Sequence, residues 1–185
     1  GDPAVEAEVF YCAASEEPVQ VAGGVEMTGR YAAVLRSSEA TDVYLYDCAS
    51  FRMPGLEVEV APREPLPLLG VVANDGGYAL ELDGAWERAG EAVPPAAPEQ
   101  ALVSVGEGQR VVPVSRVEVV GERTLLHCPR HPGFSYDADA RVLRDDFSPW
   151  LEYEGEAMVR MGSRAHLRDE GDGWRISSDQ HVMLK

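Results

Sequence analysis

The sequence predicts an all-β protein, or a β-rich one with a single short helix, built from small antiparallel barrel or sandwich units. Apolar residues recur mostly at every second position, which is the repeat of a half-buried strand. The apolar runs are short, and Gly, Pro, Asp and Ser separate them, as they do in turns between strands. One segment alone places apolar residues at helical spacing.

The first half of the chain contains a series of short expected strands. The clearest is 56–60, where three apolar side chains alternate with Glu57 and Glu59, so that one face is apolar and the other is charged. Residues 74–77, Asn-Asp-Gly-Gly, lie between two apolar runs and suit a hairpin turn. The expected strands span residues 5–12, 18–27, 30–35, 42–48, 56–60 and 78–82.

The second half contains longer expected strands. Residues 109–120 form one of them, and Pro113 interrupts it. Because proline cannot donate a hydrogen bond to a neighbouring strand, this position suits an edge strand or a bulge. Residues 157–167 carry apolar or small side chains at odd positions, two glycines then allow a turn, and residues 174–184 return. We therefore expect a long β-hairpin at the end of the chain.

Residues 137–147 are the one candidate helix. Their apolar residues recur at helical spacing, Asp137 is a candidate N-cap, and a Ser-Pro pair follows the end of the segment. The same part of the chain also fits a hairpin with strands at 134–136 and 141–143. The sequence leaves both structures open.

A proline-rich segment coincides with a change in charge balance. Residues 91–99 contain three prolines and small side chains, as an extended linker does. The first 98 residues hold 5 Arg against 17 acids, and the remainder holds 10 Arg and 1 Lys against 15 acids. We expect an acidic β unit at 1–93 and an arginine-richer β unit at 99–185, each large enough to fold alone. One β-sandwich over residues 1–185 is the alternative.

The fold of each expected unit can be described one step further. Short, strongly twisted strands suit a small closed barrel, such as an OB-like (oligonucleotide- or oligosaccharide-binding-like) barrel. This analogy concerns the fold alone, because one fold carries many functions.

The chain is strongly acidic, and this limits its partners. It has 185 residues, a formal net charge of -16 and 45% hydrophobic residues, which together indicate a soluble globular protein. Clustered Lys and Arg supply the affinity of proteins for nucleic acids and anionic membranes, so we expect neither as a partner. No apolar window is long enough for a membrane insertion. A single Lys, a single Asn and a single Ile indicate a GC-rich, bacterial genome.

Three cysteines are too few for a disulfide scaffold. Cys12 and Cys48 end similar apolar runs and could form a disulfide if the protein is exported or on the cell surface, a location that we favour over the cytoplasm. This pairing would leave Cys128 as the odd thiol. We favour buried, unreactive thiols at all three positions, because free Cys is among the most buried residue types.

The densest group of reactive side chains is the segment His-Cys-Pro-Arg-His at 127–131. Imidazole and thiolate are ligands that zinc prefers, and Cys128 and His131 stand three residues apart. His127 would point away from Cys128 if both lie on a strand, and no second pair with this spacing occurs. The metal-site hypothesis therefore rests on His127, Cys128 and His131, and a proline-shaped loop after a strand is the alternative that we favour.

No motif for another class of catalysis occurs. The sequence lacks the Gly-x-Ser-x-Gly elbow, the phosphate-binding Gly-x-x-x-x-Gly-Lys loop and the His-Glu-x-x-His motif. Glu152, Glu154 and Glu156 alternate with other residues, as the solvated face of a strand does. We therefore assign no catalytic residue and no cofactor.

Two tryptophans follow turn residues, Trp86 after Asp-Gly and Trp150 after Ser-Pro. An exposed Trp in a loop is a common anchor for a binding partner. With 8% aromatic residues the chain has few to spare, so we assign both to the edges of the core.

A strip of basic side chains marks the last part of this acidic chain. Its members are Arg160, Arg164, His166 and Arg168 at even positions of the outgoing strand, and Arg175 on the return strand. The planar guanidinium suits carboxylates and phosphates, which predicts a site for an anionic ligand or for an acidic patch on a partner. The alternative that we favour pairs the strip with acids of the same protein.

Two functions from different classes follow. The first is a non-catalytic recognition or assembly module that binds another protein or a small anionic ligand through its second half, and an unpaired edge strand could also allow a homodimer. The second is a small metal-assisted hydrolase centred on the His-Cys-x-x-His segment. We favour the first, because it needs no catalytic group.

Overall fold

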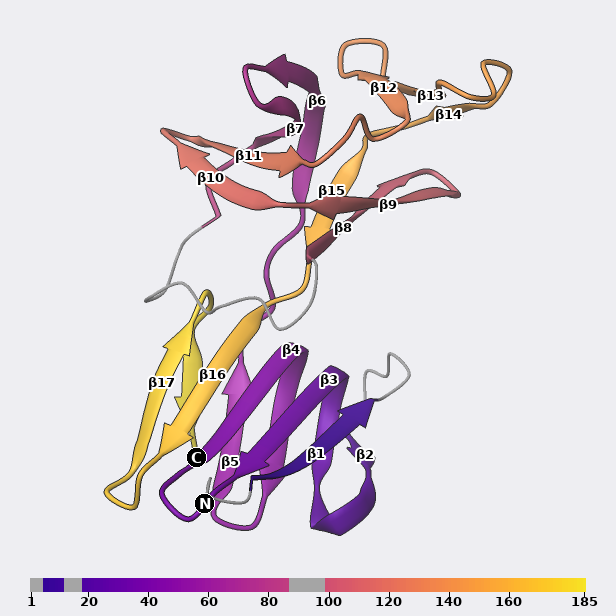
Figure 1. Ribbon diagram of the computed structural model, residues 1–185. Coiled ribbons are helices and arrows are strands. Elements are labelled where there is room, and N and C mark those ends of the chain that lie inside the picture. The colour runs from indigo at the N-terminus through magenta and orange to yellow at the C-terminus, as the bar shows by residue number, and fades with distance from the viewer. Residues whose placement is uncertain (1–4, 12–17, 87–98) are drawn as a thin grey trace. The chain divides into compact units, whose positions relative to one another are not determined.

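The computed structural model describes residues 5–11, 18–86 and 99–185, and nearly all of its regular structure is antiparallel β (Figure 1). This confirms the all-β prediction; the more specific OB-like arrangement stays a prediction. Among the described residues the one helical element is η1 (Ala22–Gly24), a short 3-10 turn. No helix in this part of the chain is long and apolar enough to cross a membrane.

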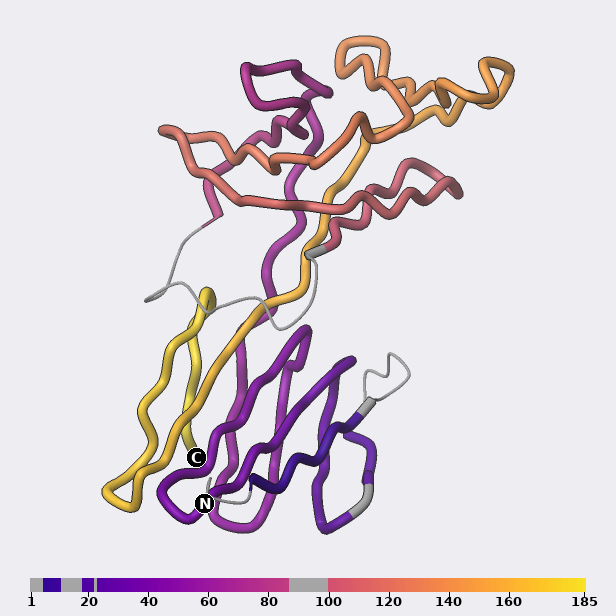
Figure 2. Tube along the Cα trace, in the orientation of Figure 1, coloured from indigo at the N-terminus to yellow at the C-terminus, as the bar shows by residue number. Residues whose placement is uncertain are grey.

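The chain forms two compact units, which we call unit 1 (residues 5–11, 18–63 and 162–185) and unit 2 (residues 64–86 and 99–161). The chain leaves unit 1 after Arg63 and returns to it at Gly162. Figure 2 traces the course of the chain by colour, from indigo to yellow. The expected division into 1–93 and 99–185 was sequential, whereas the observed units interleave, because the last strands of the chain pair with early ones. Residues 87–98, which include most of the expected linker, lie outside the described residues.

Unit 1 is built around two long neighbouring strands, β3 (Glu26–Arg36) and β4 (Thr41–Met53). All eight strands belong to one sheet that folds over into two layers (Figure 1). The main strand order is β1-β3-β4-β16-β17, and off this path β2 pairs with β3, β4 with β5 and β5 with β18. Both long strands therefore form hydrogen-bonded pairs in both layers. The remaining strands are β1 (Glu6–Tyr11), β2 (Val19–Gln20), β5 (Leu56–Val60), β16 (Arg164–Asp169), β17 (Trp174–Ser178) and β18 (Val182–Leu184).

The core of unit 1 lies between these layers. Its largest fully buried side chains include Met27, Phe51 and Leu167, from three different strands. In β5 the alternation holds as expected, because Leu56, Val58 and Val60 are buried. Transfer of this apolar surface from water is the main favourable term that holds the layers together.

A bulge bends the two long strands. Thr28 faces Ser50 but Gly29 faces Cys48, so Ala49 is an extra residue on β4. Gly29 has φ of 146°, and an added Cβ would lie 2.4 Å from both the Asp47 carbonyl oxygen and the Cys48 Cα. Only glycine fits here, because both the conformation and the close approach exclude a side chain.

Unit 2 contains a seven-stranded sheet of order β10-β11-β7-β6-β15-β8-β9. Its outermost strands β9 and β10 are consecutive in the chain, and the Ser115 amide and hydroxyl between them both donate to the His127 carbonyl, at 2.8 and 3.0 Å. The strands are β6 (Leu66–Asn74), β7 (Gly77–Asp83), β8 (Glu99–Val105), β9 (Gly108–Val114), β10 (Arg116–Val120), β11 (Arg123–Cys128) and β15 (Met158–Met161).

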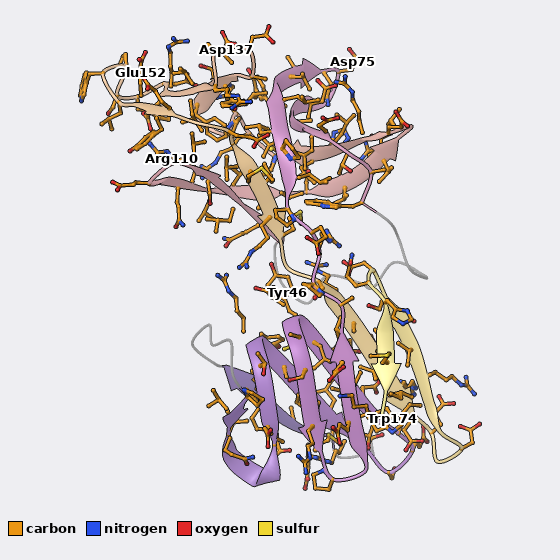
Figure 3. The ribbon with its side chains drawn as sticks, turned by 180° about the vertical axis from the view of Figure 1, so that it is seen from behind. Tyr46, Asp75, Arg110, Asp137, Glu152 and Trp174 are labelled. Carbon is orange, nitrogen blue, oxygen red and sulfur yellow. The ribbon has the colours of Figure 1, made fainter. Side chains whose placement is uncertain are left out.

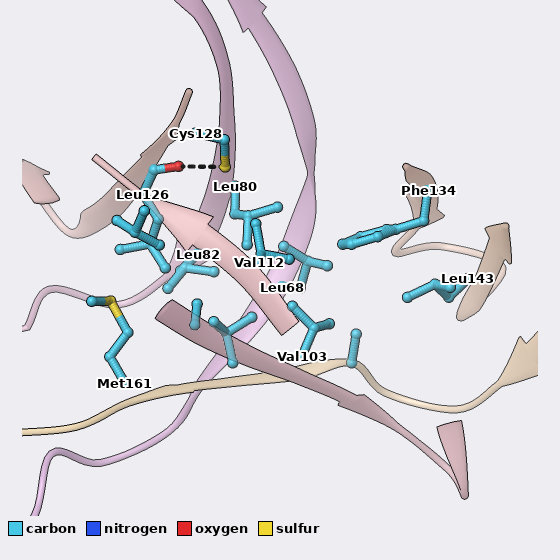
Figure 4. Close-up of a cluster of buried hydrophobic side chains, with 14 of the residues drawn as sticks. Leu68, Leu80, Leu82, Val103, Val112, Leu126, Cys128, Phe134, Leu143 and Met161 are labelled. Atoms are coloured by element: carbon cyan, nitrogen blue, oxygen red, sulfur yellow. Dashed lines mark hydrogen bonds between the residues drawn. The ribbon is translucent and has the colours of Figure 1, made fainter. Parts of the chain in front are cut away.

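A second, three-stranded sheet adds to the core of unit 2. It consists of β12 (Phe134–Asp137), β13 (Val142–Asp145) and β14 (Glu152–Glu154), in that order. Phe134 and Leu143 point from it toward Leu68 and Val103 of the larger sheet (Figure 4). One face of the small sheet is therefore fixed to the core, and its other face is polar.

Several local expectations are confirmed. The hairpin turn after β6 forms, with the Gly76 amide donating to the Asn74 side chain at 3.1 Å. Pro113 lies on β9, which pairs with β8 alone among the described strands, so its missing donor costs no ladder hydrogen bond. The hairpin alternative for 134–143 is correct, because β12 and β13 pair there. Asp137 instead caps the turn, accepting from the Ala140 amide at 2.9 Å.

Other expectations are wrong in detail. The single strand over 157–167 is divided at Gly162 and Ser163, so that β15 belongs to unit 2 and β16 to unit 1. The return strand is likewise divided into β17 and β18. Every odd residue from 157 to 167 is buried on both sides of the break, and Arg164 is the one even residue of this run that is buried as well. Alternation therefore identified the buried face but not where the chain changes partners.

Cys48 and Cys128 are buried free thiols, as we favoured. The Cys48 thiol lies 3.0 Å from the Tyr31 carbonyl oxygen, and burial raises its pKa to about 12. Burial also raises the pKa of Cys128. Both thiols are therefore protonated and weakly reactive at neutral pH. Cys12, the other member of the possible disulfide, lies outside the described residues.

We predict that Gly29→Ala destabilises unit 1 by more than about 2 kcal/mol, because the new methyl group would meet backbone atoms that cannot give way. Gly171→Ala is the matched control, since Gly171 also has a positive φ but nothing lies within 4 Å of its added Cβ. The control should cost about 1 kcal/mol. Urea unfolding measures both, and equal costs would show that the close approach at Gly29 does not constrain the fold.

Candidate recognition surfaces

The predicted basic strip is divided between the two units. Arg160 is exposed on β15 of unit 2, whereas Arg164, His166 and Arg168 lie on β16 of unit 1 and Arg175 lies on β17. In unit 1 the strip faces away from the core, because the intervening residues of β16 are buried. Four of the five expected residues are therefore brought together, and Arg160 is not among them.

The strip has acidic neighbours within unit 1. Asp42 of β4 lies 2.7 Å from His166 Nε2 and 3.2 Å from an Arg168 guanidinium nitrogen. Glu170, in the turn after β16, lies 2.8 Å from Arg168 and 3.4 Å from Arg175. The pairs with Glu170 are solvent-exposed and stabilise a fold only weakly, whereas Asp42 and His166 are partly buried. All of these acids offset positive charge on the strip.

Arg164 differs from the rest because it is buried, with 7% of its surface exposed. Its guanidinium carbon lies 5.7 Å from the centre of the Tyr46 ring, a cation-π distance. Its backbone amide donates to Asp179 at 2.9 Å, and Asp179 also accepts from Arg63. Burial raises the pKa of Asp179, and the nearby Arg63 charge opposes that effect.

Tyrosines continue the outer face of β16 onto the neighbouring strands. Tyr44 stacks on His166, with ring centres 4.3 Å apart, and Tyr46 and Tyr31 face each other on β4 and β3. The sequence analysis missed these tyrosines. The signal was present, because Asp42, Tyr44 and Tyr46 alternate with buried residues along one strand, but they were not compared with the strip. Binding by this face stays a prediction.

The three residues of the metal-site hypothesis do not converge. His127 and Cys128 are adjacent on β11 and point to opposite faces, and the thiol is buried. The His127 imidazole instead contacts Glu118 at 2.7 Å and Asn74 at 3.2 Å. His131 lies 3.3 Å from Asp146. Within residues 5–11, 18–86 and 99–185, no group of three or more His, Cys, Asp or Glu side chains is placed to hold a metal ion.

The two tryptophans have different surroundings. Trp86 is buried at the edge of the unit 2 core, as expected, and its indole donates to the Glu64 carbonyl at 2.7 Å. Trp150 is 79% exposed, so its assignment to the core edge is wrong. Phe147 is 84% exposed, and Leu151 is also exposed. These three lie in the segment 146–151 between β13 and β14, which we call the aromatic loop.

Hydrogen bonds hold the aromatic loop in one conformation. The Asp145 carboxylate accepts from the amides of Phe147 and Ser148 at 2.9 and 2.8 Å. The Leu151 amide donates to the Ser148 carbonyl at 2.8 Å, which closes a β-turn with Pro149 at its second position. The Asp145 amide donates to the Leu151 carbonyl at 3.2 Å and closes the base of the loop. The loop is thus exposed and ordered at the same time.

Two contacts fix the loop to the rest of unit 2. Arg110, labelled in Figure 3, lies on β9. Its guanidinium donates to the second oxygen of Asp145 at 2.9 Å and lies 5.2 Å from the centre of the Tyr153 ring. On the other side, the Asp146 amide donates to the Gly133 carbonyl at 3.0 Å. The Phe147 ring lies against Gly133, where a Cβ would be 2.9 Å from a ring carbon. Glycine there leaves room for the ring to approach the backbone.

The Asp145 carboxylate is stabilised in its charged form. The Ser148 amide, the Arg110 guanidinium and the Phe147 amide together hold its pKa below the usual range for Asp. The carboxylate is therefore ionised at neutral pH, and in this form it accepts the hydrogen bonds that order the loop.

No protein-family model matches the chain, and no curated protein or solved structure matches it either. Any functional assignment therefore rests on the side chains described above.

We predict that Asp145→Ala loosens the aromatic loop without unfolding unit 2. Hydrogen exchange of the Phe147 and Ser148 amides should become faster, because both lose their acceptor. Asp139→Ala, in a nearby exposed turn, is the control and should leave these rates unchanged.

The same contacts predict a pH dependence. Because the folded chain lowers the pKa of Asp145, the ordering is present above the ordinary Asp pKa and is lost as the pH falls through the lowered value. The amide proton shifts of Phe147 and Ser148 should follow this transition in an acid titration. Unchanged exchange in Asp145→Ala, or shifts that titrate above the ordinary value, would contradict this account of the loop.

Proposed function

We propose that the chain is a non-catalytic recognition module that binds a protein partner through the aromatic loop. The observation that carries the proposal is the exposure of Phe147 and Trp150 at 84% and 79% in a loop with a defined conformation. Large aromatic side chains are the commonest anchors of protein interfaces, where they fill pockets of the partner.

The defined conformation of the loop supports a binding function as strongly as its exposed aromatic residues do. A flexible loop loses conformational entropy when it binds, and a loop already held in one conformation loses less. Asp145, the Ser148–Leu151 turn and the Gly133 contact supply this order without covering either ring. Leaving two aromatic rings in water is unfavourable for the isolated chain, so their burial by a partner is favourable.

The proposal places the contact in unit 2 rather than on the basic strip. In unit 1 the side chains of Arg168, Arg175 and His166 have acidic neighbours, which weakens the attraction of the strip for an anion. The hydrolase alternative lacks a supporting observation, because His127 and Cys128 point apart and His131 contacts Asp146. The recognition class therefore fits the described residues best.

The test is photo-crosslinking from the loop itself. With p-benzoyl-phenylalanine replacing Phe147 in the full chain, we expect adducts with a partner in a native lysate of the source organism. Trp150→Ser should abolish the adducts, and it should weaken the affinity of the purified adduct protein about 30-fold or more, the effect of losing an interface anchor. Calorimetry measures this affinity.

Val120→Ser is the matched control. Val120 is also an exposed apolar residue of unit 2, so its loss removes apolar surface outside the loop and should leave binding unchanged. Urea unfolding of Trp150→Ser should shift stability by less than about 0.5 kcal/mol, since the ring is exposed. Adducts that persist in Trp150→Ser, or that Val120→Ser removes equally, would contradict recognition by the loop.

A further inference from the structure

We infer that the partner presents an apolar pocket edged by Lys and Arg side chains. This inference rests on the proposed function and adds the charge of the partner. It follows from the acidic residues that surround the aromatic loop.

The segment that carries the loop is the most acidic part of unit 2. Between residues 134 and 156 there are seven carboxylates and two arginines. Six of the carboxylates belong to residues in the exposed part of the small sheet and its turns, and the seventh, Asp145, is half-buried. A partner that covers the loop must therefore approach a negative surface.

Ion pairs neutralise only part of this charge. Arg144 pairs with Glu152 at 2.8 Å, and Arg110 pairs with Asp145 at 2.9 Å. The Asp146 carboxylate has the His131 contact at 3.3 Å. In the described part of the chain, no ion pair reaches the other four carboxylates of the segment. These are Asp137, Asp139, Glu154 and Glu156.

Two of the exposed carboxylates flank the aromatic rings in the chain. Asp146 precedes Phe147 directly, and Glu152 follows Leu151. Glu152 and Glu154 project from the same face of β14, the face opposite to Tyr153, which packs against the core. Figure 3 shows Glu152 and Asp137 on this small sheet. The loop is thus an apolar centre with an exposed carboxylate on each side, and the four carboxylates without an ion pair lie toward the other end of the small sheet. An apolar centre with a polar rim is the usual arrangement of an interface.

Charge complementarity decides between the candidate occupants. A second copy of the chain carries a net charge of -16 and would be repelled at this border. An anionic bilayer would be repelled in the same way. A protein with a basic border gains both a faster encounter and favourable pairs at the rim.

The probe is a displayed library of three-helix domains with one randomised face, selected against the immobilised full chain. Clones that lose binding to Trp150→Ser should carry more Lys and Arg, and fewer Asp and Glu, at the randomised positions than the unselected library. Their affinity should fall as the salt concentration rises.

A charge variant tests the border directly. Glu152→Gln/Glu154→Gln should weaken these clones about fivefold, the effect of losing two exposed charge pairs. Glu39→Gln/Glu57→Gln is the control, because it changes the net charge equally at exposed sites of unit 1, and it should leave the affinity unchanged.

The outcomes separate this inference from the proposed function. Loop-dependent clones without basic enrichment would overturn the inference and leave recognition by the loop standing. If no clone depends on Trp150, both fail. Sedimentation of the free chain tests whether a second copy of the chain covers the loop. A dimer that the Trp150→Ser substitution dissociates would overturn the inference of a basic partner.

Discussion

The Asp145 carboxylate is the group on which the proposed surface depends. One of its oxygens accepts from two amides of the aromatic loop, and the other is paired with Arg110 on a strand of the large sheet. A single side chain therefore orders the loop and fixes it to the core-forming part of unit 2. Without this contact, the segment that carries Phe147 and Trp150 would keep only its backbone hydrogen bonds, and binding would have to order it further.

The small sheet also has a part that is packed in the core and a part that is exposed. Phe134 and Leu143 are buried in the core of unit 2, whereas the turns beyond them reach water. Binding residues placed on loops of a rigid scaffold are common, because the scaffold sets their position while the loop remains free to vary. In unit 2 the scaffold is the curled sheet whose outer strands join at Ser115.

The sequence predicted the strands of this protein well where one face is buried and the other is solvated. Leu56, Val58 and Val60 are an example, since alternation alone identifies the buried face. It could not show that the run 157–167 leaves unit 2 and enters unit 1, because the odd residues of the run are buried on both sides of Gly162. Which strand a segment pairs with depends on residues far away in the sequence, so a local pattern of apolar residues does not predict it.

The candidate site was harder to predict than the fold. Because the chain has few aromatic residues, we expected both Trp86 and Trp150 at the edges of the core. The two sites look alike in sequence, since each tryptophan follows turn residues. They differ in what the surroundings supply. Trp86 has the Glu64 carbonyl as acceptor and a core to pack against, whereas Trp150 occupies a β-turn whose hydrogen bonds are complete without it. The basic strip was visible in sequence, but its partners, such as Asp42, come from a distant strand.

The most direct test of the central claim is fluorine NMR of the chain labelled with 5-fluorotryptophan. The chain has three tryptophans, and a Trp150→Phe variant identifies the Trp150 signal. We expect one narrow Trp150 resonance with the full solvent isotope shift of an exposed indole between H2O and D2O, and a Trp86 resonance with almost none. A Trp150 resonance that is insensitive to the solvent, like that of Trp86, would contradict the account, because the ring would then be buried in the free protein.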